Sequence, residues 1–172
     1  MTGDVEPGRD TPELVRPATA QAGPAPIRPG SKAGNPGEGG GSPALTVREL
    51  IRPGVVTATP ETTMASAAAS MVRARAGSVV VIQASFLAGI LTKWDALRAT
   101  ASGADPHVSL VSEWMTRDPQ AVSPDTPADE ATQIMLQHGI HHLPVVEGKQ
   151  VRGVVRLRDL LAARIRRTSP PA

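Results

Sequence analysis

The sequence contains no cysteine and no tyrosine, a single phenylalanine and two tryptophans. The absence of cysteine excludes disulfide bonds and thiolate metal sites, which fits a reducing compartment, and we expect a cytoplasmic protein. No apolar run reaches the roughly 18 residues that a membrane span requires, and the N-terminus lacks the basic-then-apolar order of a signal peptide. The net charge of +2 is too small to imply a polyanionic partner by itself.

The common signatures of catalysis are also missing. The chain has no cysteine nucleophile and no phosphate-binding GxxxxGKS/T loop, and its few histidines and carboxylates do not specify a catalytic triad. We therefore predict that the protein is not an enzyme.

Large apolar side chains are scarce at the N-terminus. Residues 1–43 contain eight prolines and nine glycines. Such a segment cannot bury enough apolar surface to offset the entropy of the chain, so we predict a disordered tail. The apolar residues of 44–167 are sufficient for a core, and residues 168–172 form a short C-terminal tail.

The core region is a tandem repeat with an offset of 64 residues. Residues 141–161 read as strand, tight turn, strand and helix, with Gly148 in the turn, and residues 78–97 repeat this pattern. The identities at this offset, without a gap, include the pairs Val47 with Val111, Pro60 with Pro124, Thr62 with Thr126, Met71 with Met135, Val81 with Val145, Gly89 with Gly153, Asp95 with Asp159 and Leu97 with Leu161. So many matches at one offset indicate an internal repeat.

Each repeat is predicted to contain a turn, a strand, a helix, two strands and a second helix. The first copy occupies residues 44–101, a connection follows over 102–109, and the second copy occupies 110–167. In the second copy Thr126 is the expected N-cap of a helix with Pro127 at its first position, and Gly139 is expected to end that helix. The fold class is therefore mixed α/β (α+β), with two small sheets flanked by helices that pack together.

This arrangement resembles a pair of CBS motifs, the regulatory unit also called a Bateman module. The resemblance covers residues 46–163 and is clearest in the second copy. Its motifs there are Pro124-Asp125-Thr126, the run Ile140-His141-His142-Leu143-Pro144-Val145-Val146, and the run from Gly153 to Leu160. The resemblance implies a stand-alone pair with pseudo-twofold symmetry, two clefts that commonly hold adenine nucleotides or adenosyl compounds, and dimerisation into a disk.

The resemblance also implies a set of ligand-binding residues. Asp159 and Asp95 occupy the strand-to-helix junctions, where a carboxylate can accept hydrogen bonds from a ribose diol and the helix N-terminus can receive a phosphate. Family members often carry Ser or Thr three residues earlier, as at Thr92, whereas the second copy has Arg156. Together with Arg158, Arg156 favours a charged ligand. The alternative is that both acids only cap their helices.

Base recognition in this family is implied at the first central strand of each repeat. The corresponding positions are Ile140, His141 and His142 in the second copy and Ala76, Gly77 and Ser78 in the first. The second cleft is favoured, because the first copy lacks the His-Leu-Pro pattern. The expected ligand is AMP, ADP, ATP or S-adenosylmethionine, and no catalytic cofactor is expected. A zinc site at His138, His141 and His142 is disfavoured, because neighbouring positions of a strand face opposite ways.

The predicted function is regulation, including energy sensing. An adenine ligand would shift the equilibrium between arrangements of the repeats or of a homodimer, and an effector protein would respond. One alternative is a nucleotide-independent scaffold whose clefts are filled by Arg156 and Trp94. Another, less favoured, is nucleic-acid binding through the arginine-rich C-terminus, which lacks aromatic stacking residues.

Overall fold

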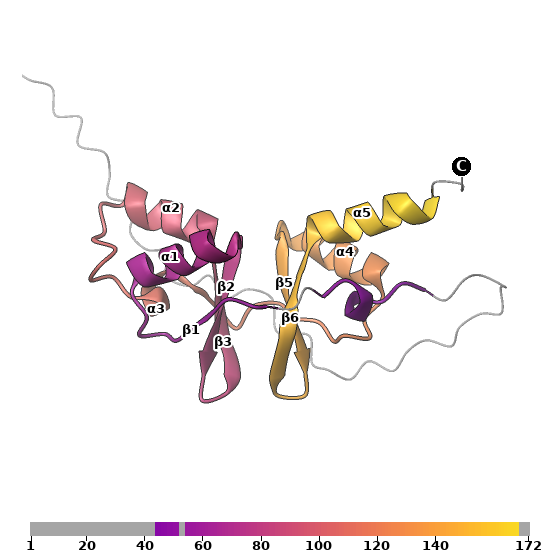
Figure 1. The fold of residues 1–172 in the computed structure, drawn as a ribbon, viewed down its shortest axis with the longest axis horizontal. Coiled ribbons are helices and arrows are strands. Elements are labelled where there is room, and N and C mark those ends of the chain that lie inside the picture. The colour runs from indigo at the N-terminus through magenta and orange to yellow at the C-terminus, as the bar shows by residue number, and fades with distance from the viewer. Residues whose placement is uncertain (1–43, 52–53, 169–172) are drawn as a thin grey trace, which may run out of the picture.

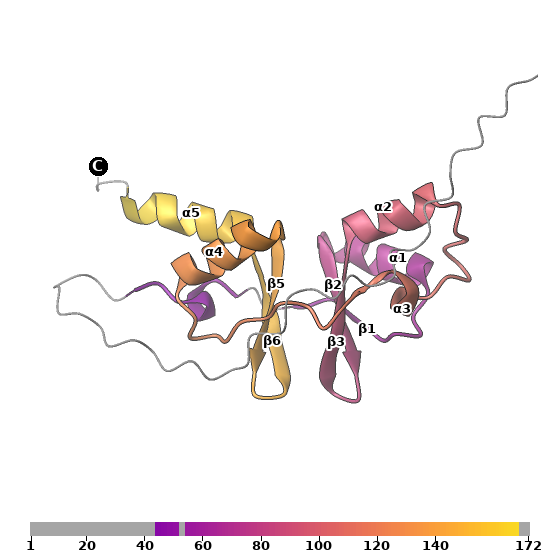
Figure 2. The ribbon, with the colours of Figure 1, turned by 180° about the vertical axis from the view of Figure 1, so that it is seen from behind.

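The computed structural model describes residues 44–51 and 54–168. The predicted disordered tail and the last four residues lie outside the described residues. Two lobes stand side by side, each with a β-hairpin toward the other lobe and helices on its outer side (Figures 1 and 2). The elements in chain order are η1 (Val47–Glu49), β1 (Thr57–Ala58), α1 (Met64–Ala74), β2 (Ser78–Gln83), β3 (Phe86–Thr92), α2 (Lys93–Ala101), α3 (Val111–Trp114), β4 (Thr116–Arg117), α4 (Ala128–His138), β5 (His142–Glu147), β6 (Gln150–Arg156) and α5 (Leu157–Thr168).

The first lobe is built on a sheet with the strand order β1-β2-β3-β4. Its two long strands pair antiparallel, β1 runs parallel to β2, and β4 runs antiparallel to β3. Gly89 of β3 allows β4 to approach, because a Cβ atom there would lie 2.7 Å from both the Met115 Sδ and the Thr116 carbonyl oxygen. The second lobe repeats this plan around the antiparallel pair β5-β6, and Val122 bridges to Val145 in parallel as Ala58 does to Val81.

The opening segment of each repeat packs on the other lobe. The amide of Val47 donates to the Thr126 carbonyl (2.9 Å), and 64 residues later the amide of Val111 donates to the Thr62 carbonyl (2.8 Å). In Figure 1 the indigo η1 accordingly lies beside α4, whereas α3 lies beside α1. Arg48 secures the exchanged segment through Asp125 (3.0 Å) and Glu147 (3.2 Å). Each lobe therefore combines parts of both sequence repeats.

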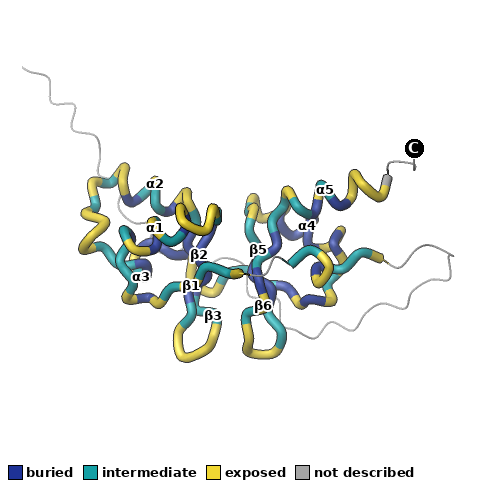
Figure 3. The backbone as a smooth tube through the Cα atoms, in the orientation of Figure 1, coloured by how far each residue is buried: buried dark blue, intermediate teal, exposed yellow. Residues whose placement is uncertain are grey.

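Each lobe encloses its own apolar core, seen as dark blue segments of the tube in Figure 3. The second core is formed by Val47, Val122, Ala128, Ala131, Ile134, Met135, Leu143, Val145, Val155 and Leu160. The first contains Met64, Ala67, Met71, Val79, Val81, Leu91, Ala99, Val111, Trp114 and Met115. Helix α1 thus buries Met64, Ala67 and Met71 in the first core, α4 buries Ala128, Ala131 and Met135 in the second, and His138 is exposed at the end of α4.

The start of α4 differs from the prediction by one residue. Pro127 rather than Thr126 is the N-cap, and no side chain caps this helix. The exchanged segment takes over the capping role, because the Leu45 carbonyl accepts a hydrogen bond from the Ala128 amide (2.8 Å). At the other end, Gly139 has a left-handed conformation with φ of 62° and ends the helix, as predicted.

The hairpin turns predict opposite effects of glycine in the two lobes. Ala84 and Ser85 both have positive φ, 48° and 70°, in the two-residue turn between β2 and β3. Such turns favour Asn-Gly, since other side chains are strained there. The double change Ala84→Asn and Ser85→Gly should therefore raise the free energy of unfolding by about 1 kcal/mol. Chemical denaturation measures this, and Gly148→Ala, at φ 62° in the other turn, should lower it instead.

Candidate functional site

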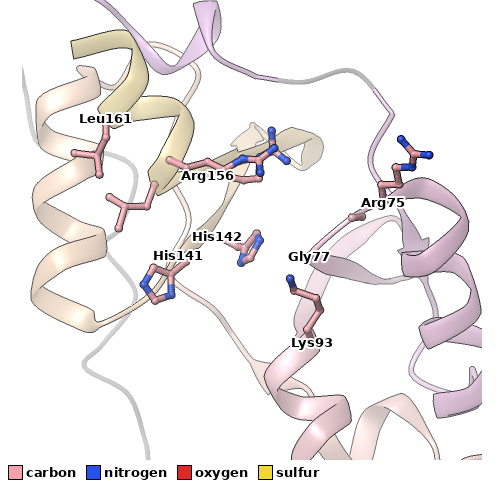
Figure 4. A pocket seen from close by; sticks show the side chains of 10 residues that line it. Arg75, Gly77, Lys93, His141, His142, Arg156 and Leu161 are labelled. Atoms are coloured by element: carbon pink, nitrogen blue, oxygen red, sulfur yellow. The ribbon is translucent and has the colours of Figure 1, made fainter. Parts of the chain in front are cut away.

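A cleft of about 350 Å³ lies between the lobes, where the central strands and the following helices begin. Figure 4 shows His142 and Lys93 approaching each other across it from opposite lobes. The first lobe contributes four of its lining residues and the second lobe six: Arg75, Ala76, Gly77, Lys93, His141, His142, Arg156, Leu157, Arg158 and Leu161. The cleft is therefore made by both repeats together.

The two halves of the cleft use equivalent positions of the repeat. Gly77 and His141 both line it and are 64 residues apart, as are Lys93 and Leu157. The cleft therefore lies on the approximate twofold axis that relates the lobes. A ligand bound here would contact both lobes and would respond to their relative position.

Gly77 allows the lobes to meet closely. A Cβ atom at this position would lie 2.5 Å from the Nε2 atom of His142, which is closer than van der Waals contact permits. The His142 imidazole thus occupies the space that a side chain at position 77 would need, and it would have to move if one were introduced. Packing, not an unusual backbone angle, favours glycine here.

His142 is held in its neutral form. Burial is the main cause, and together with the neighbouring His141, Lys93, Arg156 and Arg158 it lowers the pKa of the His142 imidazole to about 4. The neutral ring can donate one hydrogen bond and accept another. Near pH 7 it therefore adds a polar surface to the cleft without adding charge.

The lining of the cleft is strongly basic. It includes Arg75, Lys93, Arg156 and Arg158, and no carboxylate lies among its described residues. The nearest acid to these cations in the second lobe is Asp159, which accepts hydrogen bonds from the Nε and Nη2 atoms of Arg156 at 2.6 and 3.1 Å. One acid among four cations leaves an excess of positive charge, which suits an anionic ligand.

The acid of the first repeat is fully engaged inside its own lobe. Asp95 is only 5% exposed, and its Oδ2 atom accepts hydrogen bonds from the amide (2.7 Å) and hydroxyl (2.6 Å) of Thr92. Its Oδ1 atom pairs with Arg98 at 2.6 Å. Thr92 is the N-cap of α2. The first-repeat acid thus holds the helix start, as the capping alternative predicts.

The structure brings six of the eleven predicted site residues to the cleft: Ala76, Gly77, His141, His142, Arg156 and Arg158. The other five, Ser78, Thr92, Asp95, Ile140 and Asp159, are not part of its lining. Among these, Asp159 lies one contact away through Arg156, and its side chain is 14% exposed. Thr92 and Asp95 serve the start of α2.

Sequence reasoning did not identify Arg75, Lys93, Leu157 or Leu161 as lining residues. Arg75 and Lys93 are each adjacent to a predicted residue, Ala76 and Thr92, so neighbourhood in the sequence was the available signal. Neither position has a basic counterpart in the other repeat, where Gly139 and Leu157 stand. The motif comparison therefore gave no reason to select them.

The described residues form neither a metal site nor a membrane-spanning helix. Within 44–51 and 54–168, no group of three or more His, Asp or Glu side chains is placed to hold a metal ion. In the same part of the chain, no helix is long and apolar enough to cross a membrane.

Comparison with known proteins gives two matches to the CBS domain family, over residues 47–102 and 111–166. The sequence is also 35% identical over 116 residues to the CBS domain-containing protein YhcV of Bacillus subtilis (strain 168). That alignment covers 67% of this chain and 82% of YhcV.

Solved structures share the fold. The CBS-domain containing protein ATU1752 from Agrobacterium tumefaciens has a TM-score of 0.64 and 28% identity, covering 70% of this chain and 99% of that one. The CBS domain pair of protein MJ0100, solved with 5′-methylthioadenosine and S-adenosyl-L-methionine, has a TM-score of 0.67 and 23% identity, covering 73% of this chain and 100% of that one. At 23% identity this second likeness concerns the fold alone.

Proposed function

This chain belongs to the CBS domain family as a tandem pair of CBS motifs, and from this premise we propose that it binds an adenine nucleotide or adenosyl ligand between its lobes. CBS pairs are regulatory modules without catalytic activity of their own. The proposed role is a cytoplasmic sensor whose ligand changes how the protein engages an effector protein.

The observation that carries the proposal is the shared cleft on the approximate twofold axis. It joins the starts of α2 and α5, where the positive ends of the helix dipoles favour an anionic group, to the start of β5 at His142. The MJ0100 pair, which has this fold, was solved with two adenosyl compounds. Asp159 supports contact with a ribose diol, because its carboxylate is hydrogen-bonded to Arg156, which lines the cleft.

Signalling follows from the position of the cleft. Gly77 and His142 face each other across the two lobes, so a ligand placed there must contact both. A ligand that binds one lobe arrangement more tightly shifts the population toward it by its differential affinity. The exchanged segments around Val47 and Val111 tie the lobes together, so that a change at the cleft is passed to both.

A homodimer is part of the proposal. The helices α1, α2, α4 and α5 lie on the same side of the molecule (Figure 1), and they expose apolar side chains at equivalent positions of the repeats. Val72 is equivalent to Leu136 in the repeat, and Leu97 is equivalent to Leu161. All four side chains are at least 41% exposed. Such a twofold pattern suits association with a second copy, since large exposed apolar patches mark interaction surfaces.

The test of ligand binding is thermal unfolding of the full chain with AMP, ADP, ATP, S-adenosylmethionine and 5′-methylthioadenosine. A ligand at about a hundred times its dissociation constant stabilises the native state by about 2.7 kcal/mol. We expect at least one compound to do so, and Asp159→Ala should weaken its binding at least about tenfold through loss of a charge-assisted contact. The matched control is Asp129→Ala, an exposed acid near the start of α4. Equal effects of the two changes would contradict the role of Asp159.

A scaffold without a ligand is the second candidate function. It is favoured by the internal pairs Arg156–Asp159 and Arg98–Asp95, which already satisfy both acids. This candidate expects no stabilisation by any compound of the panel. The same measurement therefore decides between the two.

A further inference from the structure

We propose that the cleft selects nucleotides with two or more phosphates over neutral or cationic adenosyl compounds, and that Arg156 determines this selection. The inference rests on the proposed function, because it concerns the ligand of the same cleft. It assigns a chemical class to that ligand and a specificity role to one residue.

Charge provides the first support. Arg75, Lys93, Arg156 and Arg158 line the cleft, and Asp159 offsets only one of these charges. S-adenosylmethionine carries a sulfonium and an ammonium group against one carboxylate, so this lining repels it. A nucleoside triphosphate brings several negative charges, and the partly enclosed site weakens solvent screening of the attraction.

The side chain of Arg156 provides the second support. It uses its Nε and Nη2 atoms to hold Asp159, at 2.6 and 3.1 Å, while its guanidinium also lines the cleft. A guanidinium has five N–H donors, so two contacts to Asp159 leave donors that can reach a phosphate. Arg156 is 19% exposed and is therefore partly desolvated, which strengthens such a contact.

The first repeat shows which residue can replace Arg156. The equivalent position is Thr92, whose amide and hydroxyl hold Asp95 at 2.7 and 2.6 Å. Threonine at position 156 should hold Asp159 in the same way and preserve the start of α5. Arg156→Thr therefore removes the cation and keeps the acid in place. The variant should lose contacts to the phosphates and keep those to the adenosine.

The experiment is isothermal titration of the full chain with ATP, S-adenosylmethionine and 5′-methylthioadenosine, without added divalent cations. These probes share adenosine and differ in the charge beyond it. The wild type should bind ATP at least about tenfold more tightly than the other two. Arg156→Thr should lower the affinity for ATP at least about tenfold and change that for 5′-methylthioadenosine less than about threefold. Arg166→Ala, an exposed arginine on α5, should change neither affinity.

The possible failures are distinguishable. A wild type that binds 5′-methylthioadenosine or S-adenosylmethionine as tightly as ATP overturns the selection and leaves the proposed function standing. A wild type that binds none of the three overturns both. Arg158→Ala is a second variant at an exposed lining position, where folding is not at risk, and it should lower the affinity for ATP alone. An equal loss for 5′-methylthioadenosine in both variants would assign them a structural role and overturn the inference.

Discussion

Replacing Val47 with aspartate is expected to destabilise the second lobe, with a loss of about 4 kcal/mol in the free energy of unfolding. Val47 belongs to the first sequence repeat, but it is fully buried among Met135, Leu143 and Val145 of the second lobe. A carboxylate there would lose its hydration, and no cation of that core cluster could compensate it. The cost therefore falls on a lobe about 80 or more residues away in the sequence.

Chemical denaturation gives the size of this effect, and hydrogen exchange gives its location. The amides of β5 and β6 should lose protection, while those of β2 and β3 keep it. The control is Val108→Asp in the connection between the repeats, where a 72% exposed side chain leaves the charge in water and the change should stay within about 0.5 kcal/mol. Loss of protection confined to β2 and β3 would mean that the opening segment supports its own repeat in solution.

The fold could be predicted from the sequence because its signals are local and occur twice. The tandem CBS pair, the mixed α/β class and the regulatory, non-enzymatic character are confirmed by the family matches. The turn at Gly148 and the end of α4 at Gly139 also lie where the pattern placed them. A repeated pattern of spacing and turn residues is read from neighbours along the chain, and neighbours determine these features.

The exchange of opening segments could not be predicted in this way. By sequence, residues 45–51 fit either lobe equally well, because the same residue, valine, occupies the equivalent positions 47 and 111 of the two repeats. Which lobe each segment joins depends on the path of the connecting chain. The start of α4 shows the consequence: the Leu45 carbonyl caps it, so the threonine that the local pattern selected is not needed.

The candidate site was partly predictable for a related reason. The motif positions identified residues at the ends of strands, and six of them line the cleft. A sequence motif does not show which cation an acid pairs with in the folded protein. The pairing of Asp159 with Arg156 and of Asp95 with Arg98 is therefore visible only in the structure. Because each acid is already paired with an arginine, a ribose would have to compete with that arginine for hydrogen bonds to the carboxylate.

The second large expected effect concerns acid, and it arises at His142. The pKa of this imidazole is about 4 in the folded protein and about 6.5 when the chain is unfolded. Between these values the unfolded chain binds the additional proton, so the free energy of unfolding must fall as the pH is lowered from about 6.5 to about 4. Allowing for the partial exposure of the ring, we expect a loss of about 2 kcal/mol from this residue.

The variant His142→Ser isolates this contribution, because Ser78 occupies the equivalent position of the first repeat. The cationic groups around the ring, His141, Lys93, Arg156 and Arg158, remain in the variant, and Asp159 stays paired with Arg156. The free energy of unfolding, measured by denaturation at about pH 7 and pH 4.5, should therefore differ less between the two pH values in the variant than in the wild type, by about 2 kcal/mol. His107→Ser, at an exposed loop position, should leave the pH dependence of the wild type unchanged.

A nucleoside triphosphate in the cleft should reduce the loss of stability of the wild type in acid, because its negative charge raises the pKa of His142 toward the unfolded value. Identical pH dependence of wild type and His142→Ser would show that the imidazole is protonated in the folded protein without cost, and that the lobes separate enough to hydrate it.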